Sequence, residues 1–285
     1  MKKSYVLFNP HSSNGNGEKE ANKIKKYVNE DLEFVDLTKI ENYTQYFASL
    51  DADDKLYICG GDGTLNQLIN KCDDKFPEND IYFFGIGTGN DFLLDIGYKT
   101  PCAPVKINEY LKDLPTVEIN DKTYYFLNNV AFGIDGWVCG IAEEEKRKNP
   151  KVKTNYTIIA LKGLLGKFSP YNATVTVDNN EPVHLQRVWM SPSMNGRYFG
   201  GGMMVTPMQD RLNKDRTITY MACRNSNRFQ ITTGFIQIFK GHHLNNPIAM
   251  FLTGHEITVE FDRPCILNID GEPIFDVLKY TARKY

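Results

Sequence analysis

The chain has 285 residues, of which 41% are hydrophobic, 12% aromatic and 24% charged. This composition is ordinary for a globular protein, and it excludes a disordered chain, a collagen and a coiled coil. The mean hydropathy is -0.41 and no run of about 18 apolar residues occurs, so no transmembrane helix is expected. At roughly 150 residues per domain, the length predicts about two domains.

The charge balance argues against a nucleic-acid partner. The net charge is -2, from 33 Lys and Arg against 35 Asp and Glu, so no cationic field surrounds the whole protein and no nucleic acid is expected to bind. The six cysteines include no C-x-x-C pair, which predicts reduced thiols. Only Tyr5–Phe8 follow Met1-Lys2-Lys3 before Asn9-Pro10. Because this run is too short for the apolar core of a signal peptide, a cytoplasmic location is expected.

Strand-like and helix-like patterns alternate over the first hundred residues. Short apolar runs bounded by turn residues predict strands at Ser4–Phe8, Leu32–Asp36, Lys55–Cys59 and Asp80–Gly85. Apolar residues at helical spacing predict helices around residues 21–28, 43–50 and 65–72. This alternation indicates an open, mainly parallel sheet, which binds its ligands beyond the carboxyl ends of the strands.

Strand patterns dominate after Pro115, which predicts a mostly antiparallel second domain. Helices are predicted at Gly136–Lys146, Asn155–Lys167 and Asn227–Phe239, and Asp262-Arg263-Pro264 is read as a turn between two strands. The predicted domains are therefore residues 1–115 and 116–285. The predicted strands are Thr116–Ile119, Thr123–Ala131, Asn172–Val177, Val183–Ser191, Thr217–Ala222, Ile248–Leu252, Glu256–Phe261 and Cys265–Ile269.

Three glycine-rich segments each follow a predicted strand of the first domain. They are Asn9–Gly17, Gly60–Thr64 and Gly87–Asp91. Glycine lets the backbone turn sharply and bring N–H groups against a polyanion, and a helix N-terminus adds positive potential. One such segment could be an ordinary tight turn, but three at the same edge of one sheet indicate phosphate binding.

The phosphate ligand is best explained as a magnesium nucleotide. No G-x-x-x-x-G-K-[ST] motif is present, which excludes a P-loop NTPase. Asn66 and Asn90 stand where a dinucleotide fingerprint has its third Gly or Ala. A carboxylate at Asp62 would repel phosphate unless Mg²⁺ lay between them, and the hydroxyls of Thr64 and Thr88 suit the same ligand.

These segments resemble a known family. Gly60–Asn66 and Gly87–Phe92, preceded by Asn9-Pro10, closely resemble the diacylglycerol kinase catalytic-domain family, which includes bacterial soluble lipid kinases and the sphingosine and ceramide kinases. Asn128–Asp135 is similar to the motif that opens the second domain of that family. Gly200-Gly201-Gly202, Pro207 and Asp270-Gly271-Glu272 match its later blocks in order.

The resemblance implies ATP- and Mg²⁺-dependent phosphorylation of a lipid hydroxyl at a cleft between two domains. The first would be a three-layer α/β nucleotide-binding domain, and the second an antiparallel β-sandwich-like domain with helices. Glu272, with Asp270 as its neighbour, matches the family's proton acceptor, although on sequence alone the same residues could form a plain hairpin turn. The residues matching the nucleotide site are Asn9, Pro10, His11, Ser12, Ser13, Thr38, Gly60, Gly61, Asp62, Gly63, Thr64, Leu65, Thr88, Asn90 and Asp91.

The chain departs from the family at two places. Ser13 stands where the family usually has Gly, so the first loop is expected to lie slightly farther from the phosphates. Asn213-Lys214 replaces an Asp-Gly pair that helps bind a structural Mg²⁺ in many bacterial members. Oxygen ligands from Asp210, Asn213 and Asp215 could still hold this ion, although Lys214 adds a positive charge beside it.

A lipid acceptor would place the protein at an anionic membrane surface, peripheral to the inner face of the membrane. Five cations within Lys146–Lys153 could contact such a surface, or could form a solvated loop, since three glutamates precede them. A homodimer is also possible by resemblance. Two alternative functions stay open: a soluble kinase resembling NAD kinase, and a non-catalytic, nucleotide-responsive lipid-binding regulator, which only the altered Asn213-Lys214 supports.

Overall fold

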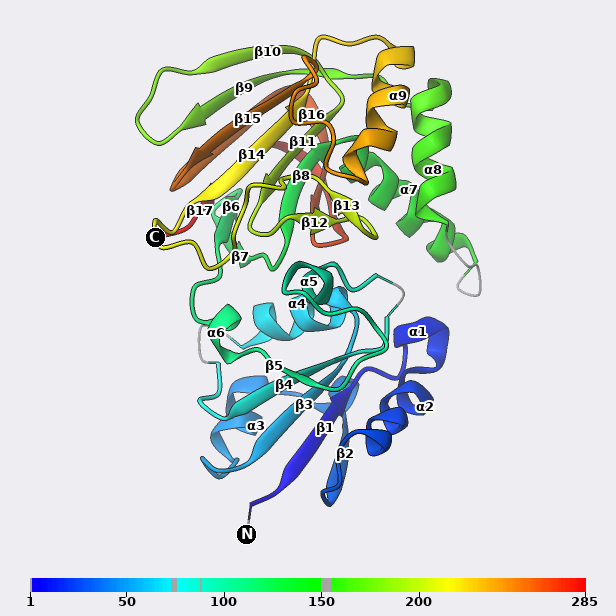
Figure 1. Cartoon of the computed structure of the whole chain (residues 1–285), viewed down its shortest axis with the longest axis vertical. Coiled ribbons are helices and arrows are strands. Elements are labelled where there is room, and N and C mark those ends of the chain that lie inside the picture. Colours follow the sequence, from blue (N-terminus) through cyan, green and yellow to red (C-terminus); the bar gives the residue numbers. More distant parts are fainter. Residues whose placement is uncertain (1, 73–75, 88, 150–154) are drawn as a thin grey trace. The chain divides into compact units, whose positions relative to one another are not determined.

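The chain forms two compact units, residues 1–112 and 113–285 (Figure 1). The structure is a computed structural model that describes residues 2–72, 76–87, 89–149 and 155–285. The division falls close to the boundary expected after residue 115.

The first unit is built on a five-stranded sheet in the order β2-β1-β3-β4-β5. Its first four strands are mutually parallel, as predicted, and β5 pairs with β4 in the antiparallel direction. The sequence pattern missed β5, because two residues are too few to show a period. The strands are β1 (Ser4–Phe8), β2 (Leu32–Asp36), β3 (Lys55–Gly60), β4 (Asp80–Gly85) and β5 (Val105–Lys106).

Helices cover both faces of this sheet, which gives the expected three layers. Phe84 packs in one apolar cluster with Ala21 and Ile24 of α2 and η1. Its neighbour Phe83 points to the opposite face, where its ring meets that of Phe92 at 6.0 Å between centroids. The helical segments are α1 (Ser12–Gly15), α2 (Gly17–Ala21), η1 (Asn22–Lys26), η2 (Leu37–Lys39), α3 (Tyr43–Ala48), α4 (Asp62–Lys71), α5 (Asp91–Asp95) and α6 (Asn108–Leu111).

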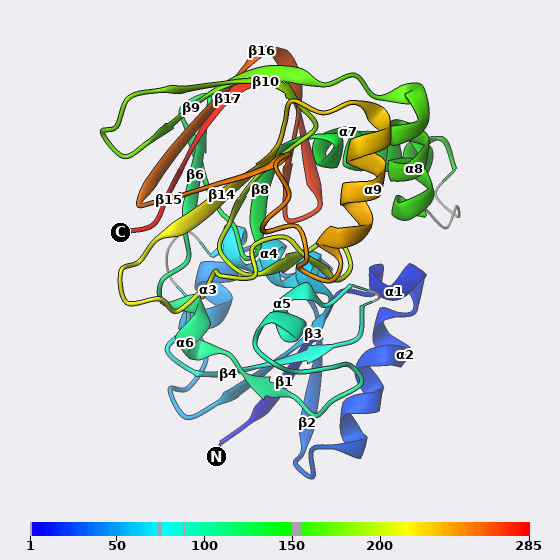
Figure 2. The same cartoon turned by 45° about the horizontal axis from the view of Figure 1, so that its top comes forward.

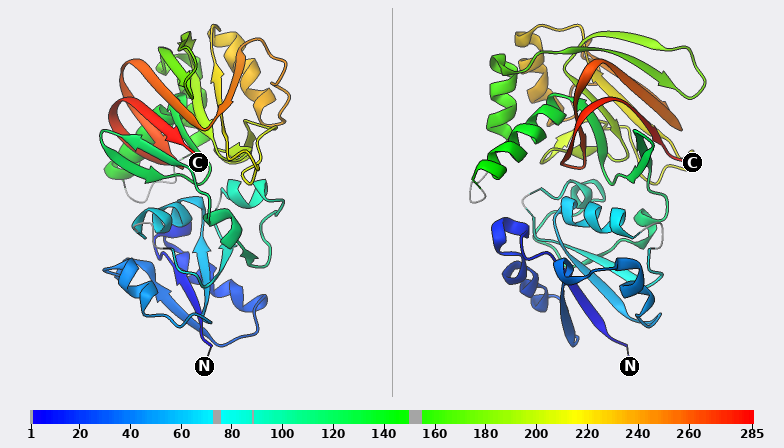
Figure 3. Two further views of the ribbon diagram at one scale, coloured as in Figure 1. Left: turned by 90° about the vertical axis from the view of Figure 1, so that its left-hand side faces the viewer. Right: turned by 180° about the vertical axis from the view of Figure 1, so that it is seen from behind.

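The second unit is a curved antiparallel sheet in the order β15-β14-β11-β8-β16-β17-β6-β7, with β9 and β10 branching from β16. The long strand β16 pairs with β9 over its first half and with β8 at its end, so the sheet folds over one apolar core. Figure 3 shows β16 and β17 as a long hairpin. The strands are β6 (Thr116–Ile119), β7 (Lys122–Tyr125), β8 (Asn129–Gly133), β9 (Tyr171–Val177), β10 (Val183–Val188), β11 (Met190–Met194), β12 (Tyr198–Phe199), β13 (Met203–Met204), β14 (Ile218–Cys223), β15 (Ala249–Gly254), β16 (Glu256–Ile269) and β17 (Glu272–Arg283).

Three strand predictions in this unit were wrong in detail. Asp262-Arg263-Pro264 is not a turn but lies within β16, at a register shift against β17 between Glu260 and Cys265. This irregularity tolerates Pro264, which has no N–H for the ladder. The run predicted as Thr123–Ala131 divides into β7 and β8. The run predicted as Val183–Ser191 divides at Trp189 into β10 and β11, just after a register shift around Arg187, whose φ is 51°.

Four helical segments pack against this sheet: α7 (Ile134–Lys148), α8 (Tyr156–Lys162), the π-helical turn η3 (Gly163–Lys167) and α9 (Arg228–Ile238). The predicted helix positions are confirmed. Helix α7 approaches β16 closely at Gly136, where an added Cβ would lie 1.8 Å from the carbonyl oxygen of Ile266. Glycine is therefore required there, because any side chain would force the helix away from the sheet.

Candidate functional site

Three loops of the first unit leave its sheet at the same edge. Strands β1, β3 and β4 are adjacent and parallel, so the segments that follow their carboxyl ends lie side by side. The amide of Ile86, just after β4, donates to the carbonyl oxygen of Gly60 at 2.9 Å. The expected convergence of the three glycine-rich segments is confirmed.

Hydrogen bonds join these loops to one another. The Ser13 hydroxyl donates to the carbonyl oxygen of Ile86 at 2.8 Å, which ties the first loop to the third. The Asp62 carboxylate accepts from the Phe92 amide at 3.1 Å, which ties the second loop to the start of α5. Ser13 has a φ of 50°, a left-handed conformation that favours glycine. This backbone conformation explains why the family usually has Gly at this position. In this chain, the hydrogen bond from the Ser13 hydroxyl compensates for the strain that a residue other than glycine brings.

Two glycine backbones touch where the second and third loops meet. A Cβ added to Gly87 would lie 2.8 Å from the Cα of Gly61. No side chain fits between the loops at this point, so glycine is required at Gly87 for the two loops to meet. Asn90 supports the third loop, because its amide donates to the carbonyl oxygen of Gly87 at 2.9 Å.

Four more of the predicted nucleotide residues lie in the first turns of α4 and α5. Leu65 is fully buried and Asp91 is 7% exposed, so the Leu65 side chain belongs to the core and only its backbone could meet a ligand. The Thr64 side chain packs directly over Gly60, and Gly63 follows Asp62 in the first turn of α4. Thr88 lies outside the described residues.

The first loop is a tight turn that runs into α1. The Asn9 side-chain oxygen accepts from the amide of His11 at 2.9 Å, and the Ser12 hydroxyl donates to the carbonyl oxygen of Asn9 at 2.7 Å. Asn9 and Pro10 are half-buried, whereas His11 is exposed. Asn9 thus shapes the loop through its side chain.

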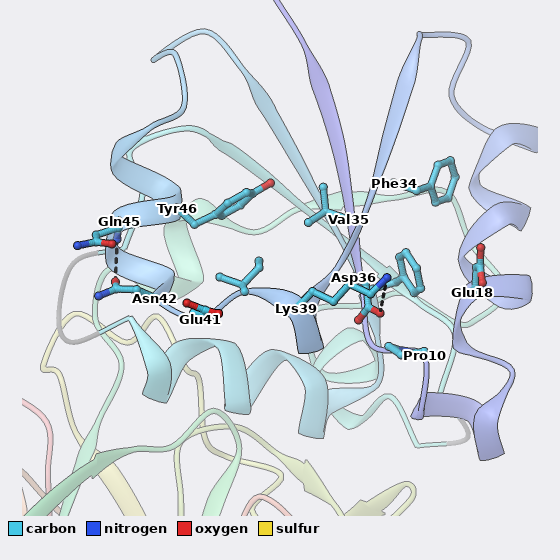
Figure 4. A pocket seen from close by; sticks show the side chains of 12 residues that line it. Pro10, Glu18, Phe34, Val35, Asp36, Lys39, Glu41, Asn42, Gln45 and Tyr46 are labelled. Atoms are coloured by element: carbon cyan, nitrogen blue, oxygen red, sulfur yellow. Dashed lines mark hydrogen bonds and ion pairs between the residues drawn. The ribbon is translucent and has the colours of Figure 1, made fainter.

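Thr38 lies apart from the glycine loops in sequence, in the turn after β2. Its amide and hydroxyl donate to Asp36 at 2.9 and 2.7 Å. Although burial raises the pKa of Asp36, these hydrogen bonds outweigh it and hold the pKa below its ordinary value. Pro10, Asp36 and Lys39 line one side of an open hollow of about 850 Å³, and Tyr46 lies across from them (Figure 4).

The second unit holds the predicted catalytic carboxylates in the turn between β16 and β17. Asp270 and Gly271 have φ of 48° and 98°, and Ile269 pairs with Glu272, so a two-residue turn with positive φ at both positions closes the hairpin. The hairpin alternative considered from the sequence is therefore correct as geometry. It leaves the chemical role of Glu272 a prediction.

The two carboxylates have different surroundings. The Asp270 carboxylate accepts from the amides of Leu127, Asn128 and Asn129 at 2.5, 2.8 and 3.0 Å. Burial raises its pKa to about 6, although these amides and Arg211 act in the opposite direction. Glu272 is exposed. Asp270 therefore organises the turn, and Glu272 is the carboxylate that a substrate can reach.

Sequence reasoning did not single out two further polar groups. Among the described residues, Asn129 Nδ2 and Asp135 Oδ2 are buried without a hydrogen-bond partner. Burial raises the pKa of Asp135 to about 8, so this carboxyl is largely protonated at neutral pH. The signal was present, since both residues belong to the Asn128–Asp135 motif, but the motif does not say which side chains are left unpaired.

The loop expected to hold a structural Mg²⁺ is closed by hydrogen bonds instead. The Asn213 side-chain amide donates to the carbonyl oxygens of Asp210 and Thr217 at 2.7 and 2.9 Å, and its oxygen accepts from the amide of Thr217 at 2.9 Å. The last bond fixes the orientation, so an N–H group faces the carbonyls that would otherwise ligate a cation. Asp215 is exposed. These residues do not fit a metal ion.

Two buried cations stand beside this loop. Arg211 donates to the carbonyl oxygen of Leu127 at 3.2 Å and to the side-chain oxygen of Asn128 at 3.0 Å. The Lys284 ammonium donates to the carbonyl oxygen of Arg211 at 2.5 Å. Burial lowers the pKa of Lys284 to about 8. Arg211 thus connects the loop to the segment that cradles Asp270.

Among the described residues there is neither a cluster of metal-ligating side chains nor a helix that could span a membrane. In residues 2–72, 76–87, 89–149 and 155–285, no group of three or more His, Cys, Asp or Glu is arranged to hold a metal ion. Within the same residues, no helix is both long and apolar enough to cross a bilayer.

Two family descriptions match the chain, one for each unit. Residues 3–118 match the diacylglycerol kinase catalytic domain, and residues 128–279 match the YegS C-terminal NAD kinase beta sandwich-like domain. A Staphylococcus carnosus protein named "Putative lipid kinase" is 26% identical over 85% of this chain and 75% of its own length. A Shewanella frigidimarina protein named "Probable lipid kinase YegS-like" is also 26% identical, over 77% of this chain and 70% of its own length.

Solved structures share the fold. A crystal structure titled as a "putative diacylglycerol kinase" from Bacillus anthracis superposes with a TM-score of 0.72 at 18% identity, covering 100% of this chain and 92% of the other. Since the YegS-type description alone spans residues 128–279 and the catalytic-domain description precedes it, the chain belongs to the lipid kinase family that joins a diacylglycerol kinase catalytic domain to a YegS-type C-terminal domain, a family of phosphotransferases.

Proposed function

We propose that this chain transfers the γ-phosphoryl group of Mg-ATP to the hydroxyl group of a membrane lipid alcohol of the diacylglycerol class. The observation that carries the proposal is the convergence of three hydrogen-bonded, glycine-lined loops at the carboxyl edge of the parallel sheet. Such an edge offers backbone N–H groups and no side-chain bulk to a polyphosphate.

The donor set of these loops supports the magnesium part of the proposal. Asp62 and Asp91 supply carboxylates and Thr64 supplies a hydroxyl, which are oxygen ligands of the kind that Mg²⁺ prefers. When bound, Mg²⁺ would neutralise the phosphate oxygens during transfer. Asp62 also holds the Phe92 amide, so it fixes the relation of two loops whether or not it meets the ion.

Glu272 is the proposed proton acceptor. As the lipid oxygen forms its bond to the γ-phosphorus and the bond from phosphorus to the departing ADP oxygen breaks, the hydroxyl proton passes to the Glu272 carboxylate. The turn at Asp270 and Gly271 positions Glu272 at the start of β17. Asp270 is a positioning residue, because its oxygens are already taken by three amides.

The acceptor alcohol is proposed to bind in the second unit near Asn129 and Asp135. Each carries a buried polar atom without a partner among the described residues. Such atoms cost free energy when unpaired, and a hydroxyl group can both donate and accept. Ile134 and Val138 belong to the apolar cluster around α7, which suits the adjoining hydrocarbon. A lipid acceptor further implies peripheral association with the cytoplasmic face of a membrane.

The test is transfer of labelled γ-phosphate from ATP to a panel of lipid alcohols in mixed micelles, with NAD as a separate acceptor. Glu272→Gln should lower turnover by about 10²-fold or more while ATP binding stays within about twofold. Glu260→Gln, a matched change at another exposed glutamate of the same sheet, should leave turnover unchanged. Transfer to NAD alone, or none to any lipid despite ATP binding, would refute the proposal.

A further inference from the structure

Helices α8 and α9 and the turn η3 expose large apolar side chains. The exposed fractions are 50% for Ile158, 48% for Leu161, 70% for Leu165, 77% for Phe229 and 67% for Ile236. We call these five residues the apolar surface. Such fractions are high for Ile, Leu and Phe, and a group of them on neighbouring segments indicates an interaction site.

Both helices are apolar on two sides. In α8 and η3, Ile159 and Leu164 are buried, while the exposed Ile158, Leu161 and Leu165 recur at three- and four-residue spacing, which aligns them on another side. In α9, Ile231 and Ile238 are buried, and no charged residue occurs from 229 to 239. One side holds each helix to the core. The exposed side of α9 carries Phe229 and Ile236 together with uncharged polar residues, Gln230, Thr233 and Gln237.

The two exposed stripes lie on adjoining segments. Figures 1 and 2 both show α8 and α9 side by side. The guanidinium of Arg228, at the start of α9, donates to the carbonyl oxygens of Leu164 at 3.1 Å and Phe168 at 2.9 Å. Phe229 is next to Arg228 in sequence and Leu165 next to Leu164, so the most exposed members of the two stripes are close neighbours.

The segments that carry the apolar surface hold charges of one sign. Residues 155–177 and 216–255 contain six Lys and Arg but no Asp or Glu, in a chain with a net charge of -2. Lys162, Lys167 and Lys240 lie in or next to these segments and are exposed. Apolar side chains flanked by cations without acidic residues match an anionic lipid surface. A second copy of the chain would bring like charges together.

The end of α7 carries charges of both signs. Lys146 to Lys148 form its last turn, so the loop alternative is wrong for these three residues, whereas Lys151 and Lys153 lie outside the described residues. Three glutamates directly precede them, and the Lys148 ammonium lies 3.9 Å from a carboxylate oxygen of Glu144. The Lys146 ammonium donates to the Tyr156 hydroxyl at 3.2 Å. This bond connects the end of α7 to the first residue of α8.

We propose that the apolar surface docks on an anionic lipid bilayer, with Leu165, Phe229 and Ile236 entering the headgroup boundary and Lys162, Lys167 and Lys240 meeting the lipid phosphates. This docking proposal rests on the proposed function in one respect only, because the protein would take up a lipid acceptor from the bilayer at this surface. Docking itself needs neither nucleotide nor turnover.

The experiment is sedimentation of the full chain with phosphatidylcholine vesicles, with and without phosphatidylglycerol, in the absence of ATP. The double variant Phe229→Ser, Ile236→Ser should bind the anionic vesicles about tenfold or more weakly. Leu278→Ser, a matched change at another exposed apolar residue on β17, should bind like the parent chain. Lys162→Gln with Lys167→Gln should weaken binding only where phosphatidylglycerol is present.

The results distinguish a lipid bilayer from a second copy of the chain as the occupant of the apolar surface. They also test the docking proposal separately from the proposed function. The docking proposal is overturned if the double variant binds vesicles as well as the parent chain does. It is also overturned if light scattering shows that the parent chain is a dimer and the double variant a monomer that still binds vesicles. If the double variant fails to fold, Leu165→Ser, at a position of η3 that is 70% exposed, decides the question by the same measurement. Vesicle binding without lipid phosphorylation would count against the proposed function alone.

Discussion

Replacing Asp270 by Asn tests whether this carboxylate positions the turn. At neutral pH its two oxygens accept three backbone N–H groups, from Leu127, Asn128 and Asn129. Asn keeps one acceptor oxygen, which can serve two of these amides, but places its own NH₂ group against the third. The variant therefore loses the carboxylate charge and sets two donors against each other.

The expected cost follows from these contacts. A hydrogen bond to a charged group contributes roughly 1.5–3 kcal/mol, and an unsatisfied buried donor costs about 1–3 kcal/mol. Asp270→Asn should therefore destabilise the second unit by about 2–4 kcal/mol, which for its size lowers Tm by roughly 5–15 °C. Glu272→Gln changes an exposed side chain and should alter stability by less than about 0.5 kcal/mol.

The assay is denaturant unfolding and phosphoryl transfer measured on both variants. We expect Asp270→Asn to lose stability, with turnover falling because Glu272 is misplaced, and Glu272→Gln to lose turnover alone. The reasoning is wrong if Asp270→Asn is as stable as the parent chain. It is also wrong if Glu272→Gln keeps full turnover while a fully folded Asp270→Asn loses it, since Asp270 would then be the proton acceptor.

Three further changes test the site. Gly87→Ala should weaken ATP binding by about tenfold or more and lower Tm, because its Cβ meets the Cα of Gly61 at 2.8 Å. Gly89→Ala meets no protein atom within 4 Å and should leave Tm unchanged; an equal fall in Tm would contradict this. Asn213→Asp should lower Tm under EDTA and regain it with Mg²⁺, and a chelator-induced fall in Tm of the nucleotide-free parent chain would show that a metal is bound after all. Burial raises the pKa of Asp135 from 3.8 to about 8, so the folded parent chain loses stability as the pH rises from about 4 to 8. Asp135→Asn has no such titration, and its free energy of unfolding should rise relative to the parent by at least about 1 kcal/mol between pH 5 and pH 8. A difference that stays constant with pH would refute this.

The first unit was largely predictable because its signals are local. Each parallel strand is a short apolar run ended by turn residues, and β1, β2 and β4 have the predicted ends. Parallel order then places the segments after β1, β3 and β4 at one edge without further information. The hydrogen bonds among the loops were not predictable, since Ser13 and Ile86 are far apart in sequence.

The second unit was less predictable because long-range contacts decide its strand ends. The predicted Thr123–Ala131 strand is interrupted because the amides of Leu127 and Asn128 turn towards Asp270, more than a hundred residues later in the chain. Asp262-Arg263-Pro264 has turn-forming residues, yet β16 continues through them, because it pairs with β9 before them, with β8 after them and with β17 along both stretches. Neither the interruption of the predicted strand nor the continuity of β16 is indicated by the residues next to it in the sequence.

The Asn213-Lys214 change has a structural explanation that removes the main support for a non-catalytic protein. Asn213 satisfies the loop carbonyls with its own N–H groups. Arg211 and Lys284, both at most 4% exposed, lie beside this loop, and Arg211 donates to Asn128 next to the Asp270 turn. Side-chain hydrogen bonds of the chain itself therefore join the loop to the turn. The departure from the family pattern is thus compensated within the chain, and it gives no reason to expect that catalysis has been lost.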